Sequence, residues 1–336
     1  MYVNGATEPV DAPLVSTFDD LASHREVPSG RGGGRGGLHG DSSAGTDTAA
    51  DRKAVSVVLT ADDFGMSPAI GFAIRRLIDM GRLSATSCLV NSPHWPAEAD
   101  RLRAVSGAID VGLHFNLTWG RPLATMPNLA PDGRFPSLGR LILRAVGRRI
   151  DVDEIAAELE RQIDRFVSAF GRLPDFLDGH QHIHALPGVR RAVLEVFVRR
   201  LAPSGAWLRY PALSLADICR NSESASSALA ITLLAFRFRH LAESRGIRGN
   251  RVFRGVRRFS EEPAYAKLFD RYLARIRPGT LIACHPGVHE DDVGDPRHPS
   301  AAREEEYAYL ASDAFAERLR RGNIRLARLR DIPATR

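Results

Sequence analysis

The chain has 336 residues, a formal net charge of +6, and hydrophobic and charged shares of 44% and 26%, which are those of a globular protein. No apolar run approaches the roughly 20 residues that span a bilayer, so we expect no transmembrane segment. The three cysteines, Cys88, Cys219 and Cys284, are too few for a disulfide framework and lack metal-site spacing. Residues 1–25 carry acids and no apolar segment, so we expect no signal peptide and a cytoplasmic location.

Residues 1–53 differ in composition from the rest of the chain. Gly, Ser, Thr, Ala and Asp dominate there, and residues 29–37 read SGRGGGRGG. A segment with so few apolar residues cannot bury enough surface to fold, so we expect a disordered tail. Arg31 and Arg35 would suit an RNA contact, but two arginines are few. We favour a flexible tail or an over-extended start of the reading frame.

From Val55 onward, strand and helix patterns alternate, and this alternation predicts a parallel sheet. The length and the number of strands favour a barrel over a flat doubly wound sheet. We therefore expect an α/β protein with one (β/α) barrel-like domain over residues 54–336. The predicted strands are 55–59, 85–91, 108–117, 175–178, 207–210, 280–284 and 324–329, the helices 69–80, 96–105, 152–170, 187–201, 228–236, 261–276 and 301–321, and a Pro/Gly-rich loop covers 119–137.

Two adjacent acids, Asp62 and Asp63, follow the first predicted strand in the stretch TADDFGMS. Ser67 and Pro68 then have the residue types that begin a helix. In α/β folds the carboxyl ends of the strands are where ligand-binding groups collect. Two neighbouring carboxylates repel each other unless a cation or a shared proton intervenes. The alternative is an Asp that caps the helix beside a solvated Asp.

Histidines lie at the ends of three further predicted strands, which favours a functional site over that alternative. They lie in GLHFNLT, DGHQHIH and CHPG. The carboxyl ends of parallel barrel strands share one face, so we expect these side chains to converge with the two acids. One Asp and two His from different strands are a common ligand set for a catalytic divalent cation. The histidines are His114, His180, His182, His184 and His285.

The three histidines of DGHQHIH cannot all be ligands of the same cation if the segment is extended. If the segment is extended, His182 and His184 alternate in direction with Ile183, so not all three can face one point. Asp178 precedes them and could orient a ligand histidine through its second ring nitrogen. Of the two acids of TADDFG, one can bind the cation while the other serves as a base.

The motifs TADDFGMS, GLHFNLT, FLDGHQHIHALPGV and CHPG resemble, in order and spacing, those of the YdjC-like carbohydrate deacetylases. This family includes chitooligosaccharide deacetylase and the hopanoid-biosynthesis deacetylase. The resemblance covers residues 55–329 and implies a (β/α) barrel-like fold. It also implies removal of acetyl groups from N-acetylated sugars with a divalent metal. DGHQHIHALPG looks closer to the chitooligosaccharide type, so we assign no hopanoid substrate.

The resemblance also implies roles for individual residues. Asp63, His114 and His180 match the metal ligands, and Asp62 matches the general base. His285 matches the histidine that protonates the departing amine. We expect the metal to be Mg²⁺ or Zn²⁺. His182, His184, Asp178, Asn116 and Trp119 are further candidates for substrate contact or for support of the ligands, and Trp119 could either stack on a sugar ring or anchor its loop.

An arginine-rich stretch over residues 237–258 has no counterpart in the family motifs. It is either a solvated face or a contact for an anionic membrane surface or a phosphorylated, lipid-linked sugar. The expected partner is thus an N-acetylated sugar or oligosaccharide that could be lipid-linked. The sequence does not decide whether the protein forms a homo-oligomer.

Two other functions remain as alternatives. A metal-dependent phosphoesterase would use the same ligands, and release of phosphate instead of acetate would distinguish it. A nucleic-acid-binding protein would use the Arg/Gly-rich segments, but it leaves the clustered histidines unexplained. We therefore do not expect nucleic acid as a partner.

Overall fold

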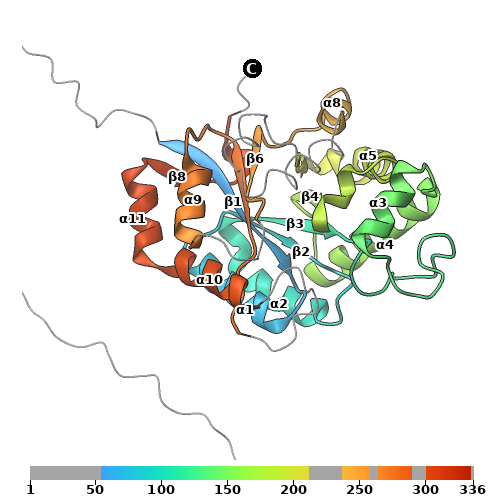
Figure 1. Cartoon of the computed structure of the whole chain (residues 1–336), viewed down its shortest axis with the longest axis horizontal. Helices are drawn as coiled ribbons and strands as arrows, with labels where there is room; N and C mark the ends of the chain where they lie inside the picture. The colour runs from blue at the N-terminus through green and yellow to red at the C-terminus, as the bar shows by residue number, and fades with distance from the viewer. Residues whose placement is uncertain (1–53, 212–236, 258–263, 290–299, 334–336) are drawn as a thin grey trace, which may run out of the picture. The chain divides into compact units, whose positions relative to one another are not determined.

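The computed structural model describes residues 54–211, 237–257, 264–289 and 300–333. The expectations of a disordered tail over 1–53 and of a helix over 228–236 lie outside these residues. Within them, strands and helices alternate along the chain, and the strands converge at the centre of the molecule with helices around them (Figure 1).

The elements have the following bounds. The strands are β1 (Val55–Phe64), β2 (Ala85–Cys88), β3 (Asp110–Phe115), β4 (Phe176–Gly179), β5 (Trp207–Leu208), β6 (Val252–Arg254), β7 (Thr280–Cys284) and β8 (Ile324–Leu326). The α-helices are α1 (Pro68–Asp79), α2 (Trp95–Val105), α3 (Leu138–Val146), α4 (Val152–Phe170), α5 (Val189–Arg200), α8 (Phe238–Glu243), α9 (Tyr265–Leu273), α10 (Ser300–Ala311) and α11 (Asp313–Arg321). Short 3₁₀ segments are η2 (Ser106–Ala108), η3 (His180–Ala185), η4 (Ala202–Ser204) and η6 (Leu329–Asp331).

The described strands form one parallel sheet that curls into a barrel. Their order is β5-β4-β3-β2-β1-β7-β6, and β8 pairs with the start of β1. The two ends meet at a single parallel bridge between Leu208 and Gly249. The Asn250 side chain extends this seam, because its amide accepts from Tyr210 N at 2.7 Å and donates to Tyr210 O at 3.0 Å. The barrel-like fold expected from the sequence is therefore confirmed.

Apolar side chains fill the interior of the barrel. Phe176 and Trp207 stack there with ring centroids 4.1 Å apart. The Phe176 ring occupies the space beside Gly112 on β3, where a Cβ would lie 2.5 Å from it. Leu329 and Ile332 join this cluster from the chain after β8. Because apolar side chains fill the interior, the polar groups of the site gather at the carboxyl ends of the strands.

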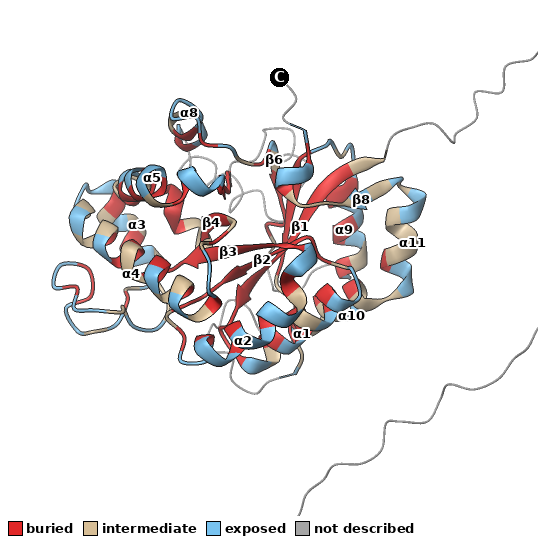
Figure 2. Cartoon of the chain, turned by 180° about the vertical axis from the view of Figure 1, so that it is seen from behind, coloured by how far each residue is buried: buried red, intermediate tan, exposed pale blue. Residues whose placement is uncertain are grey.

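Amphipathic helices cover the outside of the sheet, and α4 shows how the sequence specifies one. Asp151 caps its first turn by accepting from the backbone N–H groups of residues 153 and 154, and Gly171 ends it with φ 87°. Its buried residues include Ile155, Leu159, Ile163 and Phe166, as their spacing predicts. The strands are buried except for β8, and the outer faces of the helices are exposed (Figure 2).

The structure differs from the sequence-based elements in several places. The helix expected over 301–321 is two helices, because Ser312 interrupts it and caps α11 by accepting from Phe315 N. The strand expected over 207–210 has only two residues. The sequence analysis missed α3, α8 and β6, all short elements. The described residues contain no helix that is both long and apolar enough to cross a bilayer.

Candidate active site

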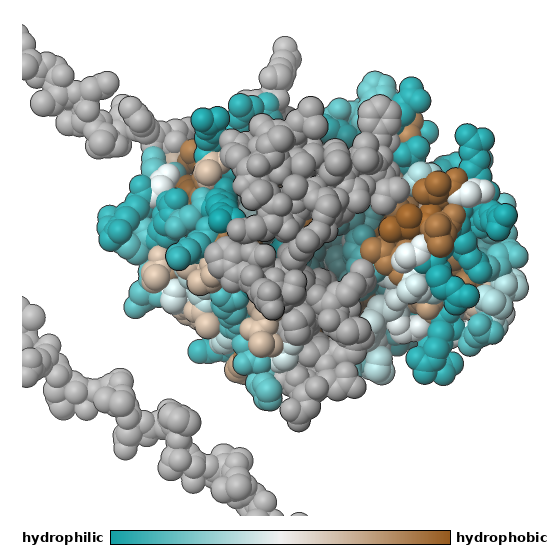
Figure 3. All heavy atoms as spheres, in the orientation of Figure 1, coloured by the Kyte–Doolittle hydropathy of each residue, from teal (hydrophilic) through white to brown (hydrophobic). Residues whose placement is uncertain are grey.

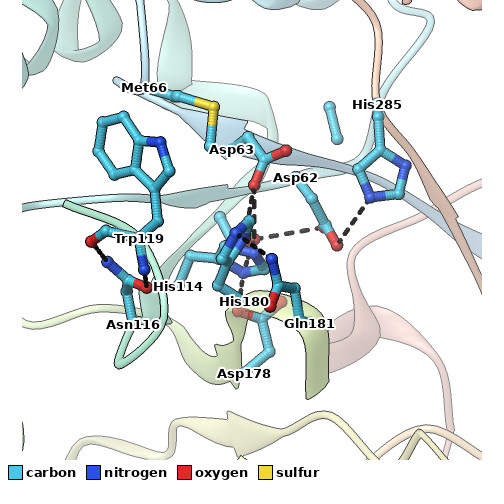
Figure 4. A network of polar contacts seen from close by, with 12 residues as sticks. Asp62, Asp63, Met66, His114, Asn116, Trp119, Asp178, His180, Gln181 and His285 are labelled. Carbon is cyan, nitrogen blue, oxygen red and sulfur yellow. Dashed lines mark hydrogen bonds and ion pairs between the residues drawn. The ribbon is translucent and has the colours of Figure 1, made fainter. Parts of the chain in front are cut away.

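The carboxyl end of β1 is kinked where the two acids lie. Asp63 has φ 66°, which is unusual for a residue with a side chain, and the pairing of β1 with β2 shifts register between Ala61 and Phe64. In a regular strand, adjacent side chains point to opposite faces. The kink instead lets both carboxylates join one polar network, while Phe64 packs in the core (Figure 4).

Asp62 is held by a buried arginine. Arg209 donates from both terminal nitrogens to the two Asp62 oxygens, each at 2.6 Å. Burial opposes ionisation of Asp62, but the charge of Arg209 outweighs it and holds the pKa of Asp62 well below its usual range. Asp62 is therefore a fixed carboxylate at neutral pH. Its Oδ1 also accepts from Ser87 Oγ at 3.3 Å.

Asp63, His114 and His180 form a compact group of possible metal ligands. Asp63 Oδ1 lies 3.0 Å from His180 Nδ1 and 3.5 Å from His114 Nε2. One potential ligand atom from each residue lies within 4.8 Å of the others, and all three residues are buried. Two ligand atoms about 2.1 Å from one cation lie about 3.0–3.4 Å apart at octahedral or tetrahedral angles. The donor types and spacings therefore fit a divalent cation.

The second nitrogen of His114 is held by Asp178. The distance from His114 Nδ1 to Asp178 Oδ1 is 2.7 Å, which leaves Nε2 directed at Asp63. Burial alone would lower the pKa of His114, but Asp178 and the other nearby carboxylates raise it to about 10. Without a bound cation, His114 is therefore a charged imidazolium at neutral pH, with protons on both ring nitrogens.

A second group of three, Asp62, His114 and Asp178, is also close enough to hold an ion. Its two carboxylates share Arg209, which donates to both Asp62 oxygens and lies 2.6 Å from Asp178 Oδ2. A guanidinium between the acids already compensates their charge and would repel a cation there. The group around Asp63 is the better candidate.

His285 lies on the other side of Asp62 from the metal-ligand candidates (Figure 4). Its Nε2 is 3.9 Å from Asp62 Oδ2, and its side chain is 16% exposed. Glu306 on α10 fixes the backbone by accepting from His285 N at 2.6 Å. Asp62 and His285 are thus two titratable groups beside the candidate metal site, and His285 is the more exposed of the two.

His182 and His184 do not join the group. The segment is not extended, because Gln181 and His182 have φ of 56° and 60° within η3. His182 packs edge-on against Phe253 at 5.0 Å. His184 Nε2 donates to Arg209 O at 3.0 Å. Burial lowers the pKa of each imidazole to about 3, so both are neutral supports.

Asn116 organises the loop that carries Trp119. Its Oδ1 accepts from the backbone N–H groups of Thr118 and Trp119, both at 3.0 Å, and its Nδ2 donates to Trp119 O at 2.7 Å. Asn91 donates to the same carbonyl at 3.1 Å. Trp119 is partly buried near Met66 and Asp63 (Figure 4). Asn116 therefore has a role in loop structure, while Trp119 borders the site.

Sequence reasoning missed the two arginines of the site. Arg209 is fully buried, and Arg303 on α10 donates to Asp63 Oδ2 at 2.6 Å. Arg303 thereby engages one Asp63 oxygen and leaves Oδ1 facing the histidines. A charged residue inside the apolar strand WLRY was the available signal for Arg209. Arg303 sits in the charged helix sequence REEE and gave none.

The fold and the site together define a class of protein, namely parallel α/β barrels with carboxylates and imidazoles gathered at the carboxyl ends of the strands. Within that class, the chain belongs to the family described as YdjC-like protein, whose model matches residues 56–321. The family resemblance of the four motifs is thereby confirmed.

Named relatives agree with this family. Chitooligosaccharide deacetylases from Yersinia pestis (strain Pestoides F) and Yersinia pseudotuberculosis serotype O:1b (strain IP 31758) are each 38% identical over 134 residues. These matches cover 40% of this chain and 52% of each relative, so the chain spans about half the length of the curated relatives it matches.

A solved structure from Enterococcus faecalis V583, of a protein assigned to cellobiose-phosphate cleavage, is similar in fold. It matches 82% of this chain and 98% of its own, with a TM-score of 0.61 and 19% identity. At that identity the likeness shows the fold alone.

Proposed function

We propose that this protein is a metal-dependent carbohydrate deacetylase that hydrolyses the acetamide of an N-acetylated sugar. The observation that carries the proposal is the pairing of two differently held acids at one strand end. Asp63 faces two histidines, while Asp62 is fixed by Arg209 and lies next to His285. The names of the Yersinia relatives support the choice of a sugar substrate.

Asp63 Oδ1, His114 Nε2 and His180 Nδ1 would hold a divalent cation, Mg²⁺ or Zn²⁺. Such a cation supplies an activated water and polarises the acetyl oxygen. Asp178 keeps His114 oriented through the opposite ring nitrogen, at 2.7 Å. Arg303 keeps the second oxygen of Asp63 occupied, which favours binding through one oxygen only.

Amide hydrolysis also needs one group to accept a proton from the attacking water and another to give one to the departing nitrogen. Asp62 is the acceptor in this proposal, because it is ionised and rigidly held. His285 is the donor, because it lies near Asp62 at the more exposed side of the site. Trp119 borders the site and offers an aromatic face to a sugar ring.

The direct test measures acetate release from a panel of N-acetylated mono- and oligosaccharides after chelation and reloading with Mg²⁺ or Zn²⁺. We expect acetate from at least one glycan only in the loaded protein. A parallel assay with sugar phosphates should release no phosphate. Phosphate release without acetate would replace the proposal with a metal-dependent phosphoesterase.

Metal content gives an independent check. His114→Ala and His180→Ala should each lower bound metal and abolish turnover, whereas the exposed His94→Ala should change neither. Full metal occupancy in both His114→Ala and His180→Ala, with folded protein, would reject this ligand set.

A further inference from the structure

The surface over α3 is unusually apolar for an outer helix. Leu143 and Val146 are 74% and 63% exposed, the highest values among the large hydrophobic side chains of the described residues. Figure 3 shows a hydrophobic patch at this position, bordered by hydrophilic surface. Both side chains lie on one side of the helix, while Leu141 and Ala145 face the core. Helix α3 therefore has two sets of apolar side chains: one packs on the core and the other faces solvent.

The chain around this helix is strongly basic. Residues 133–150 contain five arginines and no acid, namely Arg134, Arg140, Arg144, Arg148 and Arg149. In this stretch of the chain the exposed apolar residues therefore have arginines, and no acid, on both sides in sequence. This is the composition of a basic amphipathic helix, which is typical of membrane-surface segments.

A pocket of about 450 Å³ opens next to α3 and has the same character. Its apolar lining includes Ala145 and Leu194, and no acid lines it. Four arginines lie around it, namely Arg148, Arg190, Arg191 and Arg245. A lining of apolar side chains and arginines fits an anionic headgroup and the first carbons of its chain.

This surface is built from connections that leave the strand ends at which the candidate active site lies. Helix α3 follows β3, which carries His114, and residues 187–194 of the pocket follow β4 and η3. Leu241 and Arg245 belong to the segment after β5. All three connections leave the carboxyl ends of their strands, the end at which the acids and histidines lie.

We propose that the α3 face, defined as Leu143, Val146 and the arginines around them with the adjacent pocket, binds the surface of an anionic lipid bilayer. Leu143 and Val146 would enter the headgroup–acyl boundary while the arginines contact lipid phosphates. Two exposed aliphatic side chains bind a bilayer weakly alone, so the arginines are needed as a second attraction. The proposal does not depend on the deacetylase activity.

The test is co-sedimentation of the full chain with vesicles of phosphatidylcholine alone and of a phosphatidylcholine–phosphatidylglycerol mixture. Wild type should bind the anionic vesicles only, and less at higher salt. Two double variants, Leu143→Ser with Val146→Ser and Arg148→Gln with Arg149→Gln, should each lower the partition coefficient by roughly tenfold.

Matched controls separate this face from general surface properties. Phe72→Ser removes an exposed apolar side chain, 47% exposed, from α1. Arg320→Gln with Arg321→Gln removes the same charge from α11. Both should bind as wild type does, and thermal melts should show that every variant is folded.

Three outcomes would overturn the proposal. The first is absent or equal binding of wild type to the two vesicle types. The second is α3 variants that partition no less than the controls, since binding would then come from another part of the chain. The third is loss of binding in the arginine variant but not in the Leu143 and Val146 variant, which would mean charge attraction without an inserted apolar face.

Discussion

Asp62 and Asp63 are neighbours in sequence, yet each has its own arginine. Arg209 binds Asp62 and Arg303 binds Asp63, each at 2.6 Å. Arg209 directly follows β5 and Arg303 lies on α10, so the acids are held from different parts of the barrel. We expect these different surroundings to give the adjacent carboxylates different roles, and substitution of each should distinguish the roles.

Asp62→Asn should lower kcat by about 10²–10⁴-fold, because the amide cannot accept a proton. Metal content should be largely retained, and Arg209 keeps Asp178 as a partner. Asp63→Asn should instead weaken metal binding by roughly tenfold or more, so that excess metal restores part of the activity. Equilibrium dialysis with kinetics at several metal concentrations distinguishes the two. Metal loss in Asp62→Asn with retention in Asp63→Asn would mean that the roles are exchanged.

The residues of this site could be predicted from the sequence where acids and histidines lie at the ends of predicted strands. The sequence places Asp62, Asp63, His114, His180 and His285 at the ends of four strands, and parallel packing brings such positions together. The supporting arginines were not predictable in this way. Their function depends on which carboxylate they reach across the barrel, and no local pattern records that distance.

At the scale of the element, the conformation of η3 places one histidine of the segment in the candidate site and another in its support. Its backbone is left-handed at Gln181 and His182, and this turn separates His180 from His184. His184 is buried, and its Nδ1 has no hydrogen-bond partner among the described residues. Protonation would put a second, unsatisfied N–H there, which is why the neutral form is favoured.

This burial predicts a pH dependence of stability. The pKa of His184 is lowered to about 3 in the folded protein, against about 6.5 in the unfolded chain. Between these values the unfolded chain binds one more proton, so the free energy of unfolding should fall as the pH falls. His184 should contribute about 1.4 kcal/mol per pH unit to the slope, and this contribution vanishes above the unfolded value.

The check is urea unfolding of chelated protein across this range. His184→Asn removes the titrating group and should give a flatter curve by one proton, even if it is less stable overall. The exposed His94→Asn serves as the control. An unchanged slope in His184→Asn would show that other groups carry the acid sensitivity.

The connection from β6 to the chain beyond it requires glycine at one position. Gly255 has φ 106°, and a Cβ there would lie 2.6 Å from Ala283 N on β7 and closer still to Ala283 O. Gly255→Ala should therefore destabilise the protein by about 3 kcal/mol or more. Gly246→Ala should cost only about 1 kcal/mol, because its φ is also positive but nothing lies within 4 Å. Equal losses in denaturant unfolding would refute the close approach.

Long elements were predicted better than short ones. Helix α4 has enough turns for its apolar period and its caps to stand out. Strands β5 and β6 have two and three residues, and too few side chains to show an alternation. Tertiary pairing with β4 and β7 makes them strands, and that information lies elsewhere in the chain.

At the scale of the whole molecule, the barrel closes through one backbone bridge and the side chain of Asn250. The alternation of strands and helices predicted the barrel, but not that Asn250 would complete the seam between β5 and β6. Asn250 is almost fully buried and bonds both polar backbone groups of Tyr210. Side-chain closure of this kind leaves no periodic pattern in the sequence.

Asn250→Ala should cost about 2–4 kcal/mol, because it leaves the Tyr210 N–H and C=O unsatisfied. Amide hydrogen exchange should accelerate first at residues 207–210 and 248–252, where the seam opens. Asn128→Ala, which removes a surface contact with Asp151, is the control. Uniform acceleration over the whole sheet would show global destabilisation instead of a local seam.

The residues of the candidate metal site lie far apart in sequence, and this separation determines when the site can form during folding. Asp63 and His180 are 117 residues apart in sequence, and Asp63 and Arg303 are 240 apart. Contacts across such separations require most of the barrel to be assembled first, because each closes a long loop at an entropic cost. A cation bound there would form its bonds after the rate-limiting step and would leave the refolding rate unchanged. It would instead slow unfolding, and so extend the lifetime of each folded molecule.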